Sequence, residues 1–89
     1  MLTPAQGDTI IPAWPIYTFR IRQGSHSSDV PVDLENDDAA WDEAAMVCYD
    51  MFRDTITRLR DSPEWRLEVA DESGNVRYLF RLTAETFDK

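Results

Sequence analysis

The hydrophobic residues of the chain repeat at two spacings, which predict strands on both sides of a central helix. Residues 16–22, 65–70 and 76–83 alternate between apolar and polar side chains, the pattern of a strand that buries one face. Residues 23–28 form a polar turn, and residues 29–34 can form only a short strand, because Pro31 lacks a backbone donor and belongs at a sheet edge. We expect the first strand to be central, since it is long and has no edge-protecting residue.

The central stretch, residues 36–60, predicts one long amphipathic helix. Asn36 can cap its first turn, and Pro63 prevents it from continuing. The face that we take to be the core face carries Trp41, Ala44, Ala45, Cys48, Phe52, Thr55, Ile56 and Leu59.

A flank beside this face is also apolar. It consists of Ala40, Val47 and Met51, and it widens the apolar sector beyond the roughly 100° that one packing surface needs. We therefore expect the flank to be covered, either by the N-terminal arm with Ile10, Ile11 and Trp14 or by a second protomer.

The last two strands are predicted to form a hairpin whose register can be argued from side-chain alternation. Pairing Val69 with Tyr78 and Leu67 with Phe80 matches apolar residues, whereas a shift by one residue would turn arginines into the core. The loop is then residues 72–75, in which Gly74 or Asn75 takes a positive φ.

These elements predict an α+β fold in the order β-β-α-β-β. We expect a single compact domain, residues 15–85, in which an antiparallel sheet of three to four strands carries the long amphipathic helix on one face. Residues 1–14 are predicted to form a loose N-terminal arm and residues 86–89 a C-terminal tail.

Charge and composition limit the classes of function that the chain can have. The net charge of −8 disfavours general binding to nucleic acids and anionic lipids, since such binding depends on neutralising phosphates. The chain has no apolar run of 18 residues and no secretory signal, so we expect no membrane association and a cytoplasmic location. The single cysteine, Cys48, cannot form an internal disulfide and is interpreted as a small core residue.

Candidate catalytic residues are few. His26 is the only histidine, and it lies in a polar turn where we interpret it as a solvated loop residue. The chain has no glycine-rich phosphate-binding motif and no CxxC pair. We therefore predict no catalytic residue, no metal ligand and no cofactor, and a protein that is not an enzyme.

An acidic segment, residues 29–43, contains enough carboxylates to bind calcium or magnesium. Their spacing is not that of an EF-hand loop, and Asp37 and Asp38 are explained by the preference of a helix N-terminus for negative charge. Metal binding is therefore only a third hypothesis.

Five arginines are expected to share the outward face of the sheet: Arg20, Arg22, Arg66, Arg77 and Arg81. Such a face can be an ordinary solvated surface with Arg–Glu pairs, or an interaction face for an acidic protein surface. Nucleic acid is a weaker candidate, because Leu79 is the only large apolar residue on this face and no aromatic residue is there to stack on bases.

Three motifs carry a family resemblance: IRQG after the first strand, DDAAWDEA at the start of the helix, and EWRLEV followed by DESG in the hairpin. In these motifs the chain resembles a family of small bacterial proteins known only as a domain of unknown function. The resemblance covers roughly residues 17–85 and implies a compact α+β domain. It implies no activity, so no site residues are carried over.

Two hypotheses of function follow. The preferred one is a non-enzymatic interaction or regulatory module that self-associates, most simply as a homodimer, through the helix flank or a sheet edge. An unidentified protein partner is compatible with it. The second is a nucleic-acid-associated or antitoxin-like module that uses the arginine face, and it rests on fold analogy alone.

Overall fold

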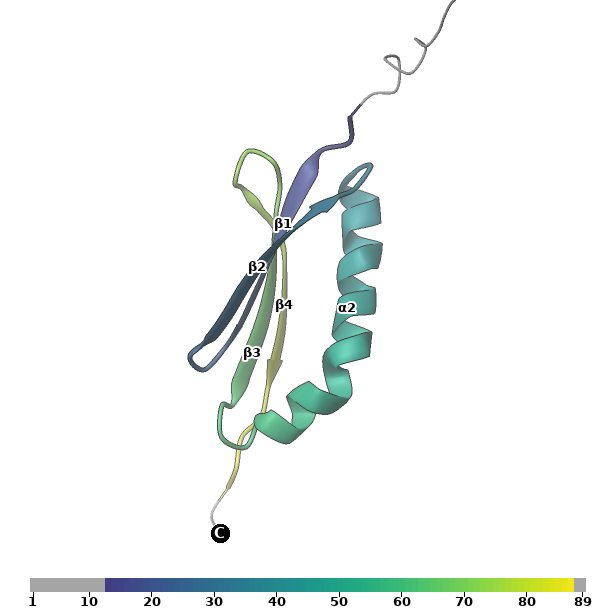
Figure 1. Ribbon diagram of the computed structural model, residues 1–89. Helices are drawn as coiled ribbons and strands as arrows, with labels where there is room; N and C mark the ends of the chain where they lie inside the picture. Colours follow the sequence, from purple (N-terminus) through teal and green to yellow (C-terminus); the bar gives the residue numbers. More distant parts are fainter. Residues whose placement is uncertain (1–12, 88–89) are drawn as a thin grey trace, which may run out of the picture.

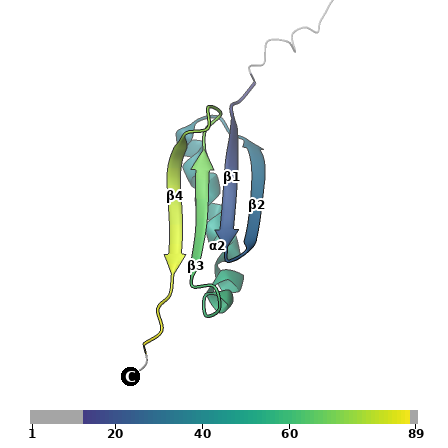
Figure 2. The ribbon, with the colours of Figure 1, turned by 90° about the vertical axis from the view of Figure 1, so that its left-hand side faces the viewer.

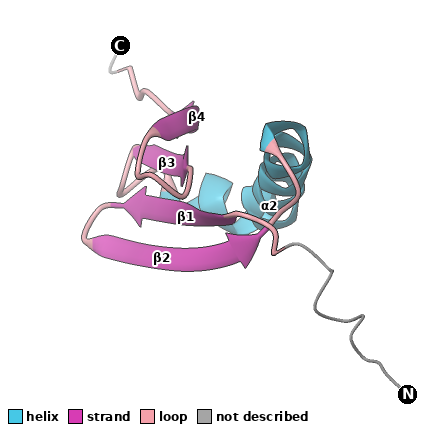
Figure 3. Cartoon of the chain, turned by 90° about the horizontal axis from the view of Figure 1, so that it is seen from above, coloured by secondary structure: helices cyan, strands magenta, loops and turns pink. Residues whose placement is uncertain are grey.

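The computed structural model describes residues 13–87, which form a four-stranded sheet and one helix alongside one face of it (Figure 1). The elements follow in the order β1 (Ile16–Gln23), β2 (His26–Asp33), α2 (Asp37–Arg58), β3 (Glu64–Ala70) and β4 (Val76–Thr83). Seen from above, the sheet and the helix form two layers (Figure 3). The predicted α+β class and β-β-α-β-β order are confirmed.

The sheet is antiparallel, with strand order β2-β1-β3-β4 (Figure 2). The first strand is central, as predicted, and the strand that contains Pro31 lies at an edge. The prediction that this edge strand is short was wrong, because β2 has eight residues and begins at His26. The turn before it is reduced to two residues, which is possible because Gly24 adopts a φ of 60°.

The predicted register of the last hairpin is confirmed, since Leu67 lies opposite Phe80 and Val69 lies opposite Tyr78. Beyond that point the register shifts, and Ala70 lies opposite Val76. Arg77 is therefore the extra residue of a β-bulge, which changes the direction of its side chain.

The hairpin loop is held by one carboxylate. Oδ1 of Asp71 accepts hydrogen bonds from the backbone N–H groups of Ser73 and Asn75, at 3.0 and 2.9 Å. Gly74 adopts a positive φ of 91°. It is one of the two loop residues for which a positive φ was predicted.

Helix α2 begins and ends close to the predicted positions. Asn36 is its N-cap, with Oδ1 accepting a 2.8 Å hydrogen bond from the backbone N–H of Ala39. At the other end Leu59 is the C-cap, and Arg58 in the last turn is favourable to the terminal carbonyls.

The helix face that packs on the sheet differs from the predicted one. Ala40, Ala44, Thr55 and Leu59 are buried, and the predicted flank residues Val47 and Met51 pack against the core. Trp41, Phe52 and Ile56, predicted for the core, are exposed. The true core face is rotated by about 60° from the prediction, at 100° per residue.

The reason for the rotation is steric. Ala40 and Ala44 are fully buried, and their small side chains allow the helix to approach a sheet face that already carries Phe19, Trp65 and Leu67. Larger side chains on the same line would hold the helix further away. Ala40 is thus buried within the protomer, whereas Val47 and Met51 pack against the core and are half-buried. The sheet of the same protomer therefore covers much of the predicted flank.

The N-terminal arm lies mostly outside the described residues, so the prediction that Ile10 and Ile11 cover the helix stays untested. Trp14, the arm residue that is described, is exposed.

Candidate interaction surface

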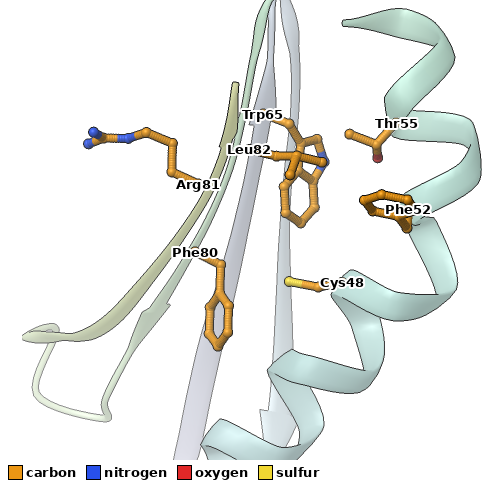
Figure 4. Close-up of a pocket in the computed structure, with 7 residues that line it drawn as sticks. All are labelled: Cys48, Phe52, Thr55, Trp65, Phe80, Arg81 and Leu82. Atoms are coloured by element: carbon orange, nitrogen blue, oxygen red, sulfur yellow. The ribbon is translucent and has the colours of Figure 1, made fainter. Parts of the chain in front are cut away.

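An apolar groove separates α2 from edge strand β4 (Figure 4). Its volume is about 170 Å³, and seven residues line it: Cys48, Phe52, Thr55, Trp65, Phe80, Arg81 and Leu82. In Figure 4 the side chains of Phe80 and Leu82 lie on the helix side of the sheet, whereas Arg81 points away on the other side. The groove is therefore an almost wholly apolar opening between the two layers.

Exposed apolar residues border this groove along the helix. We call Trp41, Tyr49, Phe52 and Ile56 the helix stripe. The exposed fractions of Trp41, Tyr49 and Phe52 are 48%, 78% and 51%. Monomeric proteins rarely leave several large apolar side chains together in water, so such a row indicates a contact surface.

Two residues of the helix stripe, Trp41 and Phe52, lie on the β4 side of the helix. The ring of Trp41 contacts the rings of Tyr78 and Phe80, with centroids 5.1 and 4.8 Å apart. Phe52 lines the groove together with residues of β4. The stripe, the groove and the edge strand consequently form one continuous surface, which we call the groove-and-edge surface.

Strand β4 contributes an open edge to this surface. Within residues 13–87 it pairs only with β3, so the backbone groups along its other side have no strand partner. Its sequence, VRYLFRLT, contains no proline, which commonly blocks a sheet edge, and its two charged residues are Arg77 and Arg81. Val76 and Leu79 are exposed on it.

Cys48 lies half-buried in the groove. Burial raises the pKa of its thiol, so the side chain is neutral at neutral pH. This agrees with the interpretation of Cys48 as a small apolar residue rather than a nucleophile.

Sequence reasoning missed a polar cluster at the start of the helix. Asp37 accepts a 2.7 Å hydrogen bond from the hydroxyl of Tyr17 and a 3.0 Å hydrogen bond from Nε of Arg77. Its backbone carbonyl accepts from the hydroxyl of Tyr78 at 3.2 Å. Asp37 thereby ties the helix N-terminus to β1 and β4. The only sequence signal for it was a carboxylate in the first helical turn.

This cluster shifts the pKa of two groups. The hydrogen bond to Asp37, together with burial, raises the pKa of Tyr17 to about 12. The same hydrogen bond lowers the pKa of Asp37; partial burial opposes the lowering and Arg77 adds to it. Both shifts favour the arrangement in which Tyr17 is neutral and Asp37 is ionised.

Arg77 does not join the outward arginine face. The β-bulge turns its side chain toward the helix N-terminus, where Nη2 lies 2.8 Å from Oδ2 of Asp37. The prediction that placed Arg77 on the outward face was therefore wrong, because strict alternation does not continue through a bulge.

The remaining four arginines do lie close together. Arg22 lies opposite Arg66, and Arg66 lies opposite Arg81, so three arginines form one row across β1, β3 and β4. All four arginines have carboxylate partners: Arg20 and Arg66 with Glu68, Arg22 with Asp29, and Arg81 with Glu64. This is the pattern of a solvated face with internal Arg–Glu pairs rather than an uncompensated basic patch.

The other sequence candidates stay apart from this surface. His26 begins β2 and is exposed, so it lies in a strand rather than in the predicted turn. Among residues 13–87, no group of three or more His, Cys, Asp or Glu side chains is arranged to hold a metal ion. In the same part of the chain, no helix has the length and apolarity needed to cross a bilayer.

The fold and this surface define a small α+β domain with a helix-covered antiparallel sheet. Comparison with protein families identifies it further: the family described as Domain of unknown function (DUF6894) matches residues 16–83, and the chain belongs to that family. The matched residues begin with β1 and end with β4. The comparisons with curated proteins and with solved structures gave no match.

Proposed function

We propose that this domain is a non-enzymatic interaction module that self-associates through its groove-and-edge surface. The observation that carries the proposal is the helix stripe, a row of exposed large apolar residues beside an apolar groove and an open strand edge. Burial of such residues is the main source of free energy in protein association.

The states of the reactive groups support a role without catalysis. The thiol of Cys48 is neutral, and Asp37 is engaged by Tyr17 and Arg77 in a contact that joins the helix to the sheet. Among residues 13–87, the groups with shifted pKa values are therefore explained by packing and by a structural cluster.

Sedimentation velocity of the wild-type protein at several micromolar concentrations tests self-association. We expect the average mass to rise with concentration toward that of a dimer. The Phe52→Glu variant places a charge in the groove and should raise the dimer dissociation constant about tenfold or more.

The matched control is Met46→Glu, which introduces the same charge at an exposed apolar residue of the same helix that does not line the groove. Its dissociation constant should equal that of the wild type. A wild-type protein that stays monomeric at all concentrations, or equal effects of the two substitutions, would contradict the proposal.

A second candidate function is the binding of an anionic partner such as nucleic acid by the arginine row. The row of Arg22, Arg66 and Arg81 favours it, and the carboxylates paired with these residues weaken it. Retention on heparin is the measurement: a variant with Arg66→Glu and Arg81→Glu should elute earlier than the wild type, and unchanged elution would remove this candidate.

A further inference from the structure

The geometry of β4 points to the way in which two copies join. We propose, building on the self-association above, that β4 pairs with β4 of a second copy in antiparallel orientation. The two sheets then form one continuous eight-stranded sheet about a two-fold axis that passes at Phe80. Self-association by side-chain contacts alone would satisfy the proposed function without this pairing, so the two ideas can be separated.

The first support is the contrast between the edges of the sheet. The β2 edge carries Pro31 between Asp29 and Asp33, which oppose pairing with another strand. Over its regular part, residues 78–83, the β4 edge has no proline and one charged residue, Arg81, whose side chain points to the outward face. An open edge of this kind is a template for another strand.

The second support is the register. In an antiparallel pair about a two-fold axis, opposite residues point to the same face, so the axis passes at a single residue. An axis at Arg81 would place that residue opposite its own copy, and like charges opposite each other are unfavourable. An axis at Leu79 would place Arg81 opposite the bulged Arg77, where regular pairing has ended.

An axis at Phe80 avoids both conflicts. Phe80 then lies opposite Phe80 of the second copy, and Tyr78 lies opposite Leu82, so apolar residues meet on the helix side. On the outward side Leu79 lies opposite Arg81, and no two arginines of the paired strands face each other. The segment Tyr78–Leu82 is thus complementary to itself in this register.

The helices add the remaining contact area. A two-fold axis perpendicular to the sheet leaves both copies of α2 on the same face, with their stripes on either side of the axis. At its exposure, the helix stripe offers roughly 400 Å² per copy, taking 150 to 250 Å² for a whole aromatic side chain. That is about half of the ~800 Å² per partner of a stable interface, and β4 supplies backbone and side-chain area for the rest.

Disulfide trapping between two single-cysteine substitutions tests the register. Leu79 and Arg81 are exposed on the outward side, so Leu79→Cys and Arg81→Cys leave the core intact. Directly opposite residues of antiparallel strands have Cα atoms about 4.5 to 5.5 Å apart, within the range that a disulfide spans. Cys48 is retained, and mass spectrometry of disulfide-linked peptides distinguishes its products from the others.

Each register gives a different product. An axis at Phe80 predicts that a mixture of the two variants forms the mixed 79–81 disulfide well above the twofold excess that random pairing gives. Self-linked Leu79→Cys indicates an axis at Leu79, and self-linked Arg81→Cys an axis at Arg81; either result overturns the proposed register.

The control is Met46→Cys, which measures cross-linking by chance collision at an exposed helix position. If wild-type protein dimerises in sedimentation but neither strand variant cross-links more than this control, β4 pairing is wrong and the proposed self-association stands. If wild-type protein is monomeric at all concentrations, both are wrong.

Discussion

The two hairpins of the sheet differ in their turns, their registers and the edges that they present. The β1–β2 hairpin has a two-residue turn, a regular register of eight residue pairs and an edge with proline and aspartate. The β3–β4 hairpin has a bulge, a polar cluster that fixes the helix N-terminus, and an edge without proline beside an apolar groove. The edge of the first hairpin is suited to contact with water, whereas the edge of the second offers apolar surface for contact with another molecule.

The largest difference should appear in stability. Leu67 in β3 is fully buried, whereas Val30 in β2 is 42% exposed on the edge. Leu67→Ala should lower the free energy of unfolding by about 2 to 5 kcal/mol, because a cavity is left under the helix. Val30→Ala should cost less than about 1 kcal/mol. Urea unfolding measures both, and equal costs would contradict the view that the β3 side carries the core.

The next effect concerns the polar cluster. Tyr17→Phe removes the hydrogen bond to Asp37 while keeping the buried ring. The free energy of unfolding should fall by about 1.5 to 3 kcal/mol, the net value of a hydrogen bond to a charged group. Thr18→Ala, an outward and partly exposed position on the same strand, is the control, with little expected change. Urea unfolding of both variants at neutral pH measures the two changes, and equal changes would contradict a specific role of the hydrogen bond to Asp37.

The pH dependence of stability follows from the same cluster. The folded pKa of Tyr17 is about 12, above its ordinary value of 10.0, so its contribution is complete below pH 10.0 and is lost as pH rises toward 12. The pKa of Asp37 is lowered from 3.8, so its contribution is present above pH 3.8 and is lost as pH falls further. In Tyr17→Phe the alkaline loss should be smaller, as thermal unfolding at each pH measures; an unchanged alkaline profile would mean that Tyr17 does not cause it.

The third effect concerns the dimer dissociation constant and compares the two edges of the sheet. Leu79 on β4 and Val30 on β2 are exposed apolar residues on opposite edges, at 44% and 42%. Leu79→Lys adds edge protection next to the arginine expected across the dimer axis, and it should raise the dimer dissociation constant about tenfold, or about 1.4 kcal/mol. Val30→Lys should leave the constant unchanged. Sedimentation equilibrium measures both, and a reversed order would show that β2 is the contact edge.

The smallest effect is expected on the outward face. The side chain of Arg66 is 40% exposed and lies 4.0 Å from its carboxylate partner. Arg66→Ala should change the free energy of unfolding by less than about 0.5 kcal/mol, because exposed ion pairs contribute little. Urea unfolding at low and high salt checks this, and a clear salt-dependent loss would show that the arginine row is a coupled network.

Much of the framework could be predicted from the sequence, because it depends on local chemistry. Alternation placed β1, β3 and β4, Pro31 assigned its strand to an edge, and Asn36 marked the helix start. The β3–β4 register followed because only one alignment buries apolar residues on both strands.

The helix face and the bulge could not be predicted in this way. Hydrophobicity ranks Trp41 and Phe52 above Ala40 and Ala44 as core residues, but the distance between the two layers favours the smaller side chains. The bulged residue Arg77 contacts the helix N-terminus, and alternation along the strand carries no signal for a contact between residues 40 positions apart in the chain. The groove-and-edge surface depends on both features. The sequence therefore shows the apolar residues that form this surface but not their arrangement.

The two buried alanines also determine a dimension of the molecule. Two methyl groups, at Ala40 and Ala44, act as the spacer between the layers, although neither residue lines the groove. The distance between the helix and the sheet therefore determines the width of the opening between α2 and β4, and residues outside the groove control that distance. Side-chain volume at these two positions is a means of tuning the groove without altering any residue that a partner would touch.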